Sequence, residues 1–218
     1  WNGGVSDDLG KVIDYISKLY PKRPIDVVGF SLSGNILLKY LGEKRRKPLK
    51  IRKGCAINPP IDLKISSHLL SKTMKGAFFN RYFMKLLHKQ GEALAECFPD
   101  MRRPSGKEKT ILEFDQGYTA PAAGYKDADD YYKKCSAKKF LESITTPTTI
   151  IYSEDDPFIQ TEIFKSVRLS SSIKIYTPEH GGHMGYISNK PTPWGDHRWM
   201  DFMVADWAGD LRSAENSF

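Results

Sequence analysis

One serine stands where the chain is expected to turn from a strand into a helix. The segment G-F-S-L-S-G-N at residues 29–35 follows an apolar run typical of a short buried strand, and it precedes an apolar run that indicates a helix. A serine between small residues at such a turn can act as a nucleophile, because the tight turn exposes its hydroxyl. The usual pattern is G-x-S-x-G; here Ser31 is the central serine, and the small residue Ser33 takes the last position. The motif alone is equally typical of an ordinary Gly-Ser turn that opens a helix.

Candidates for the partners of this serine lie near the other end of the chain. A nucleophilic serine needs a general base, and the base needs an orienting acid. An expected strand at residues 148–152 runs into Asp155 and Asp156, and the next expected strand runs into a glycine loop that carries His180 and His183. Between Asp156 and His183 there is room for one helix and one strand. The chain order of serine, acid and histidine, each on a loop after a strand, favours the nucleophile over the ordinary turn.

Several motifs together resemble the YheT-like branch of the α/β hydrolases, a family of esterases and lipases. Its members carry an elbow close to G-F-S-L-G-G-N, an acid motif close to D-D-P-F and a base motif H-G-G-H. This sequence has the elbow with Ser33 in place of a glycine, the acid motif at residues 155–158 and the base motif at residues 180–183. Further matches extend the resemblance over most of residues 1–207: G-x-S-x-D-L at 4–9, P-x-D-L at 60–63, E-F-D at 113–115, T-A-P at 119–121 and D-Y-Y at 130–132.

The resemblance implies an α/β-hydrolase fold, in which helices flank a mostly parallel sheet and a helical cap is inserted. Carried over residue by residue, Ser31 is the nucleophile, Asp156 the acid and His183 the base. Asp155 and His180 are the rival assignments, and the family pattern favours the second member of each pair. The implied activity is cleavage of carboxylic esters through an acyl-enzyme, with short- to medium-chain acyl esters or acylglycerols as substrates and with no cofactor or metal. The alternatives are an acyltransferase with the same triad, or a non-catalytic fragment or binding module.

The oxyanion of such a reaction needs two backbone donors. One is the N–H of Leu32, the residue after the nucleophile, and the other comes from a loop upstream of the elbow. Only one expected helix precedes the elbow strand here, and the chain begins at Trp1 rather than at a methionine. We therefore expect an N-terminally truncated domain without its first strands and its second donor. Loss of one donor typically lowers the rate about a hundredfold, so we expect weak activity from this chain alone.

The chain divides into three expected segments. Residues 1–60 form a partial core with the elbow, residues 61–146 form the helical cap, and residues 147–218 form the C-terminal core with the acid and base loops. Within the cap, residues 74–90 are expected to be an amphipathic, aromatic-rich helix that ends at Gly91.

The aromatic residues of this helix are candidates for an acyl-chain pocket. Phe78, Phe79 and Phe83 are expected to bind substrate, together with Phe30 beside the nucleophile. For any one of the cap residues, packing of the cap on the sheet is the more typical role.

Charge and composition restrict the partners. The net charge is +7, from 33 basic and 26 acidic residues, and much of it lies between Lys44 and Lys53. This segment is typical of a solvated loop, or it could contact an anionic membrane surface. Because no aromatic residues alternate with these basic residues, a nucleic-acid site is not expected. The sequence indicates no oligomeric state.

The cysteines and the hydropathy suggest a location. Three widely spaced cysteines suggest a reducing compartment. No run is long enough to span a bilayer, and no signal peptide is present in these residues. We therefore expect a cytoplasmic protein, or a membrane-associated one if a segment upstream carries an anchor.

Overall fold

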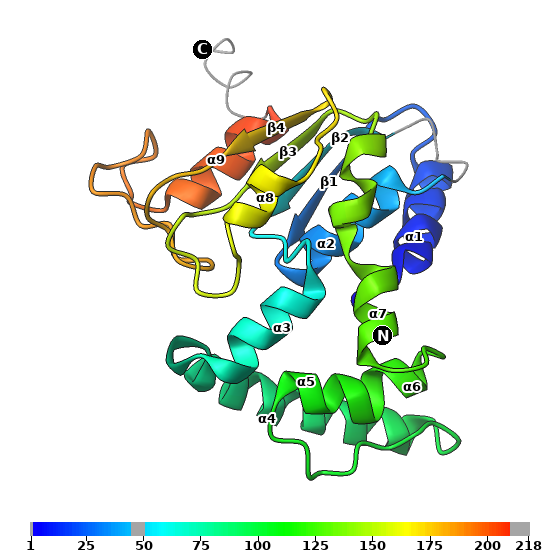
Figure 1. Cartoon of the computed structure of the whole chain (residues 1–218). Coiled ribbons are helices and arrows are strands. Elements are labelled where there is room, and N and C mark those ends of the chain that lie inside the picture. The colour runs from blue at the N-terminus through cyan, green and yellow to red at the C-terminus, as the bar shows by residue number, and fades with distance from the viewer. Residues whose placement is uncertain (1, 45–50, 210–218) are drawn as a thin grey trace.

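Among the residues that the structure describes, four parallel strands form a sheet in the upper half of the view in Figure 1. The structure is a computed structural model, and it describes residues 2–44 and 51–209. The strands are paired in chain order, so each neighbour in the sequence is also the neighbour in the sheet. In order they are β1 (Ile25–Phe30), β2 (Ile51–Ile57), β3 (Thr148–Ile151) and β4 (Ile173–Tyr176).

The central strands are apolar on both faces because both faces of the sheet are covered. Ala56 and Ile150 face one helical layer, whereas Cys55, Ile57 and Ile151 pack in the cluster on the other side. In the parallel register Ile57 lies beside Ile151, so β2 and β3 end at the same edge of the sheet. The loops that follow these strands therefore meet at that edge.

Helices cover the two faces of the sheet (Figure 1). On one face lie α1, α2, the 3₁₀ helix η2 and α8, which share one core cluster; on the other face α9 packs through its tryptophans. Helix α2 connects β1 to β2, and α8 connects β3 to β4. The bounds are α1 (Ser6–Leu19), α2 (Leu32–Gly42), η2 (Ala137–Ser143), α8 (Glu162–Ser166) and α9 (Trp199–Ala208).

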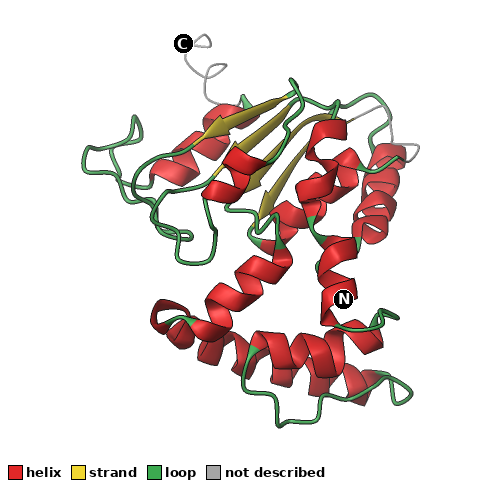
Figure 2. Cartoon of the chain, in the orientation of Figure 1, coloured by secondary structure: helices red, strands yellow, loops and turns green. Residues whose placement is uncertain are grey.

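A second, purely helical part lies between β2 and β3 in the sequence and beside the sheet in space (Figure 2). Side-chain caps fix where four of its helices begin. Asp62 accepts from Ile65 N (3.2 Å), Thr73 from Gly76 N (3.0 Å), Thr110 from Glu113 N (3.2 Å) and Asp127 from Asp130 N (2.8 Å). The elements are α3 (Leu63–Lys72), α4 (Met74–Cys97), α5 (Ile111–Phe114), the π-helical turn η1 (Asp115–Thr119), α6 (Ala120–Ala122) and α7 (Ala128–Cys135).

Helix α4 corrects one boundary of the sequence analysis. The expected helix at residues 74–90 is present, but it does not end at Gly91 and continues to Cys97. A Cβ at Gly91 would lie 2.8 Å from Cγ of Pro104. This glycine therefore allows a loop to pack closely on the helix instead of ending it. Among the helices of residues 2–44 and 51–209, none is both long and apolar enough to cross a bilayer.

Candidate active site

Ser31 occupies a strained turn between β1 and α2. Its φ of 48° and ψ of −121° are unfavourable for a residue with a side chain. A hydrogen bond from Ser31 N to Ile57 O (2.8 Å) holds the turn against β2. A Cβ at Gly29 would lie 2.6 Å from Ser33 O, so this position needs glycine; one at Gly34 would lie 3.1 Å from Gly29 O, which is a tight contact. Ser33 is exposed, which explains why this position accepts serine.

The structure brings Ser31, His183 and Asp156 into one hydrogen-bonded chain. Ser31 Oγ lies 2.8 Å from His183 Nε2, and His183 Nδ1 lies 2.8 Å from Asp156 Oδ2. Because the carboxylate can only accept, Nδ1 carries the ring proton and Nε2 is left to accept from the serine hydroxyl. The Asp156 side chain is fully buried and that of His183 is 15% exposed, so little water competes for these contacts.

The Asp156 carboxylate is held on both of its oxygens. Oδ1 accepts from the backbone N–H groups of Phe158 (2.8 Å) and Ile159 (3.2 Å), within its own loop after β3. Oδ2 accepts from His183 and also from the side-chain amide of Asn58. With its acceptor positions shared in this way, the carboxylate has one orientation.

Asn58 is a residue of this site that the sequence analysis missed. It directly follows β2, is fully buried and has a φ of 45°, a conformation that asparagine tolerates better than most residues. Its amide donates to Asp156 and to Gly182 O (3.2 Å), and its carbonyl oxygen accepts from the Tyr186 hydroxyl. Its only signal in the sequence is its position, because it is a polar residue at the carboxyl end of a buried strand.

The structure does not bring the rival residues to Ser31. Asp155 accepts from Gly181 N (3.0 Å) and Gly182 N (2.7 Å), so it shapes the glycine loop that carries His183. The His180 side chain is 85% exposed, and its Nδ1 lies 3.6 Å from Asp155 Oδ2.

Ser31, Leu32 and His183 line a cavity of about 370 Å³. Most of its other lining side chains are apolar, and most of these belong to the helical part between β2 and β3. The N–H of Leu32 is at the first position of α2, where backbone N–H groups have no partner within the helix. The larger apolar side chains of the lining, besides Leu32, are Leu63, Leu70, Phe83, Leu87, Leu94, Met101, Ile111, Phe114, Phe158 and Ile159.

The four expected substrate-binding phenylalanines differ in position. Phe83 lines the cavity, and Phe79 packs edge-to-face on Phe158 with 4.7 Å between ring centroids; Phe158 in turn packs on the His183 ring. Phe78 and Phe30 do not line the cavity. The Phe78 residue is 75% exposed and Phe30 is 44% exposed.

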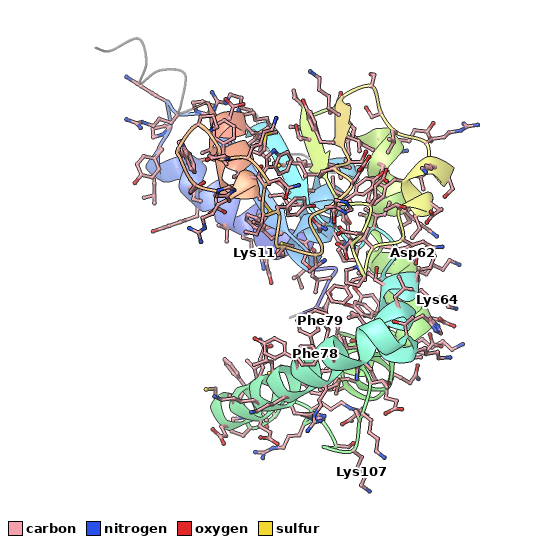
Figure 3. All side chains as sticks on the ribbon, turned by 90° about the vertical axis from the view of Figure 1, so that its left-hand side faces the viewer. Lys11, Asp62, Lys64, Phe78, Phe79 and Lys107 are labelled. Carbon is pink, nitrogen blue, oxygen red and sulfur yellow. The ribbon has the colours of Figure 1, made fainter. Side chains whose placement is uncertain are left out.

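Helical periodicity explains this difference. Phe83, Leu87 and Leu94 share the face of α4 that lines the cavity, and Phe79 lies one turn before them. Phe78 does not line the cavity and is mostly exposed. Figure 3 shows Phe78 and Phe79 on the side of α4 that faces the sheet part of the molecule.

The basic segment is only partly described, because residues 45–50 lie outside the described residues. Within the rest, Arg52 Nε donates to Asp26 (2.8 Å), and Lys53 lies over the Trp207 ring at 4.4 Å. Both side chains therefore have partners within the fold, and the membrane contact stays a prediction. No three His, Cys, Asp or Glu side chains of the described ranges are grouped as metal ligands.

A family model described as the alpha/beta hydrolase fold matches residues 2–190. With the parallel sheet and the serine elbow, this match shows that the chain belongs to the α/β-hydrolase family. Over 212 residues the chain is 29% identical to the Escherichia coli (strain K12) protein named "Putative esterase YheT", covering 95% of this chain and 61% of that protein.

A second relative is the monoacylglycerol lipase of Saccharomyces cerevisiae, which is 27% identical over 200 residues, covering 87% of this chain and 44% of that protein. The chain thus spans 61% and 44% of the lengths of these two relatives. Among solved structures, an alpha/beta fold family hydrolase from Bacillus anthracis str. Sterne matches with a TM-score of 0.50 and 16% identity, covering 82% of this chain and 67% of that one. This likeness concerns the fold.

Proposed function

We propose that the protein is a serine hydrolase that cleaves carboxylic esters. The observation that carries the proposal is the hydrogen-bonded chain from Ser31 through His183 to Asp156, with two contacts of 2.8 Å, at the wall of an apolar cavity. Geometry of this kind is what nucleophilic catalysis by a serine requires.

The reaction follows from the positions of these groups. His183 Nε2 takes the proton of Ser31 as its oxygen attacks the acyl carbonyl, and the oxyanion that forms lies near the N–H of Leu32. Asp156 keeps the imidazole in the required tautomer and stabilises the imidazolium. The alcohol then leaves with the proton from His183, and an acyl ester remains on Ser31. Water attacks this ester as His183 takes a proton from it, which releases the acid and restores the serine.

The cavity supports a substrate with an apolar acyl group. Its lining from α3, α4 and α5 consists mainly of aliphatic and aromatic side chains, whose contact with an acyl chain removes apolar surface from water. The two relatives carry the names "Putative esterase YheT" and "Monoacylglycerol lipase". We therefore propose short- to medium-chain acyl esters or acylglycerols as the substrate class.

The test is covalent labelling of the purified full-length protein by a fluorophosphonate probe, together with turnover of a nitrophenyl ester. We expect wild-type labelling and turnover, and loss of both in Ser31→Ala. The matched control is Ser33→Ala, because this serine lies on the same turn but is exposed and outside the hydrogen-bonded chain. Labelling or turnover that persists in Ser31→Ala would refute the assignment.

A further inference from the structure

A polar cluster interrupts the apolar lining of the cavity. Asp115 and Thr119 come from the π-helical turn η1, Tyr132 from α7 and Ser67 from α3, and all four line the cavity. The Tyr132 hydroxyl donates to Asp115 Oδ2 (2.8 Å) and lies 2.9 Å from the Ser67 hydroxyl. Three elements of the helical part thus direct polar groups to one place in the cavity. None of these groups takes part in the reaction proposed for Ser31.

The Asp115 carboxylate has acceptor capacity that the protein does not use. It receives side-chain hydrogen bonds from Tyr132 and Thr119, whereas a carboxylate offers about four acceptor positions. No cation is paired with it within the part of the chain that the structure describes. Burial raises the pKa of Asp115 to about 6, although hydrogen bonds from Thr119 and Tyr132 oppose this rise. A charge in such a place destabilises the free protein, and a ligand that donates a hydrogen bond to it would offset that loss.

The backbone also points to a ligand site at this position. Asp115 and Thr119 open and close one π-helical turn, so both side chains project to the same side of the helix. Single π-turns within α-helical segments are uncommon and occur frequently at functional sites. The neighbouring elements α5 and α6 continue the chain on either side, so the turn is an insertion within a helical run.

The chemistry of the cluster selects a neutral hydroxyl group. The hydroxyls of Tyr132, Ser67 and Thr119 can each donate and accept, and the Asp115 carboxylate accepts; these are the partners that a bound alcohol uses. Burial keeps the pKa of Tyr132 far above its usual range, so this residue stays uncharged and keeps its hydrogen bond to Asp115. A phosphate or carboxylate on the ligand would be repelled by the Asp115 carboxylate in this mostly apolar cavity.

We propose that Asp115, with Tyr132, Ser67 and Thr119, forms a subsite that binds a hydroxyl group of the ester substrate. This inference rests on the proposed ester hydrolysis, because the subsite and Ser31 share one cavity. The hydroxyl can belong to the alcohol of the ester, as in a glycerol monoester, or to its acyl chain. In either case an ester without the hydroxyl leaves the remaining acceptor positions of Asp115 unused and is the poorer substrate.

Two matched substrate pairs test the subsite and distinguish its sources. The first pair is a monoacylglycerol and the propyl ester of the same fatty acid; the second is the methyl ester of a hydroxy fatty acid and that of the unsubstituted acid. For one of the pairs, we expect wild-type kcat/KM to favour the hydroxyl-bearing ester by at least about tenfold. In Asp115→Leu this ratio falls to near 1, mainly because kcat/KM for the hydroxyl-bearing ester is lost.

A phosphorylated substrate tests the predicted effect of charge. The glycerol-phosphate monoester of the same acid should be a poor substrate for the wild type, and Asp115→Asn should improve its kcat/KM because the repelling charge is removed. The control is Asp100→Leu, since this aspartate is exposed and does not line the cavity. It should leave every ratio unchanged.

The outcomes separate the subsite from the proposed function. If Ser31 is labelled and esters are cleaved, but wild-type kcat/KM is equal within both pairs, the subsite is refuted and ester hydrolysis stands. If neither labelling nor turnover occurs, ester hydrolysis is refuted, and the subsite with it. If Asp115→Leu does not fold, the wild-type kcat/KM ratios and the Tyr132→Phe variant still test the subsite. Removal of the Tyr132 hydroxyl should also lower the preference for the hydroxyl-bearing ester.

Discussion

Replacement of Asp115 by asparagine should stabilise the fold at neutral pH, and the gain should depend on pH. The pKa of Asp115 is raised by burial from 3.8 to about 6, so the folded protein binds this proton more tightly than the unfolded chain does. The stabilisation that the folded protein gains by binding this proton more tightly is therefore fully present below pH 3.8, and it is lost as the pH rises through about 6. Asparagine keeps the shape and an acceptor for Tyr132 but carries no charge at any pH.

The size of this effect follows from the two pKa values. A rise from 3.8 to about 6 corresponds to about 3 kcal/mol of stability lost between acidic and alkaline pH. Asp115 is partly exposed, so this value is an upper bound. Integration of the same linkage assigns about half of this loss to the interval between pH 5 and pH 8, which is about 1–2 kcal/mol. For a protein of this size, the advantage in Tm of Asp115→Asn should grow by about 3–6 °C over that interval.

The assay is thermal and urea unfolding of wild type and Asp115→Asn at several pH values from 5 to 8. The difference between the two proteins isolates this carboxyl group from the other titrating groups, including the Tyr131 and Tyr132 hydroxyls that face it. The exposed aspartate in Asp100→Asn is the control and should show no such trend. A stability difference that stays constant from pH 5 to pH 8, or one that shrinks, would refute the reasoning.

Two further predictions concern the support of the site. Asn58→Asp replaces the amide that donates to Asp156 by a second carboxylate. The kcat for an ester should fall about 10- to 100-fold, because a hydrogen bond to a charged group is lost. Steady-state kinetics measure this change, and an unchanged kcat would contradict the prediction. Gly29→Ala should destabilise the fold by about 1–3 kcal/mol and abolish fluorophosphonate labelling, because its Cβ would meet backbone atoms of Ser33 and Gly34 within 3 Å. The control is Gly117→Ala, where the atom nearest to the new Cβ belongs to the flexible Glu108 side chain. Its melting temperature should be higher than that of Gly29→Ala, and equal melting temperatures would contradict the prediction.

The parts of the fold that depend on local pattern could be predicted from the sequence. Apolar runs bounded by turn residues predict the strands, and parallel strands bring their carboxyl ends to one edge. This is why the loops with Ser31, Asp156 and His183 could be expected to meet before any geometry was known. The single helix and strand between Asp156 and His183 are confirmed as α8 and β4.

The features that escaped prediction depend on distant partners. Asn58 and Asp156 are 98 positions apart, and nothing near Asn58 indicates that it holds the acid. Gly91 looks like a helix terminator because the pattern around it does not reveal that Pro104 folds back onto it. For the phenylalanines of α4, the helical period predicts which side chains share a face. It does not predict which face meets the cavity, because that depends on how α4 packs.

The helical part is inserted between two adjacent strands, and this separates the residues proposed to react from most of those proposed to select the substrate. The chain leaves the sheet after Ile57 and rejoins it at Thr148, while the register between β2 and β3 is set by the strands themselves. The groups proposed to break the bond are attached to the sheet, and those proposed to choose the substrate are attached mainly to the insertion. Mutations that alter substrate choice can therefore accumulate in the insertion without moving the reacting atoms.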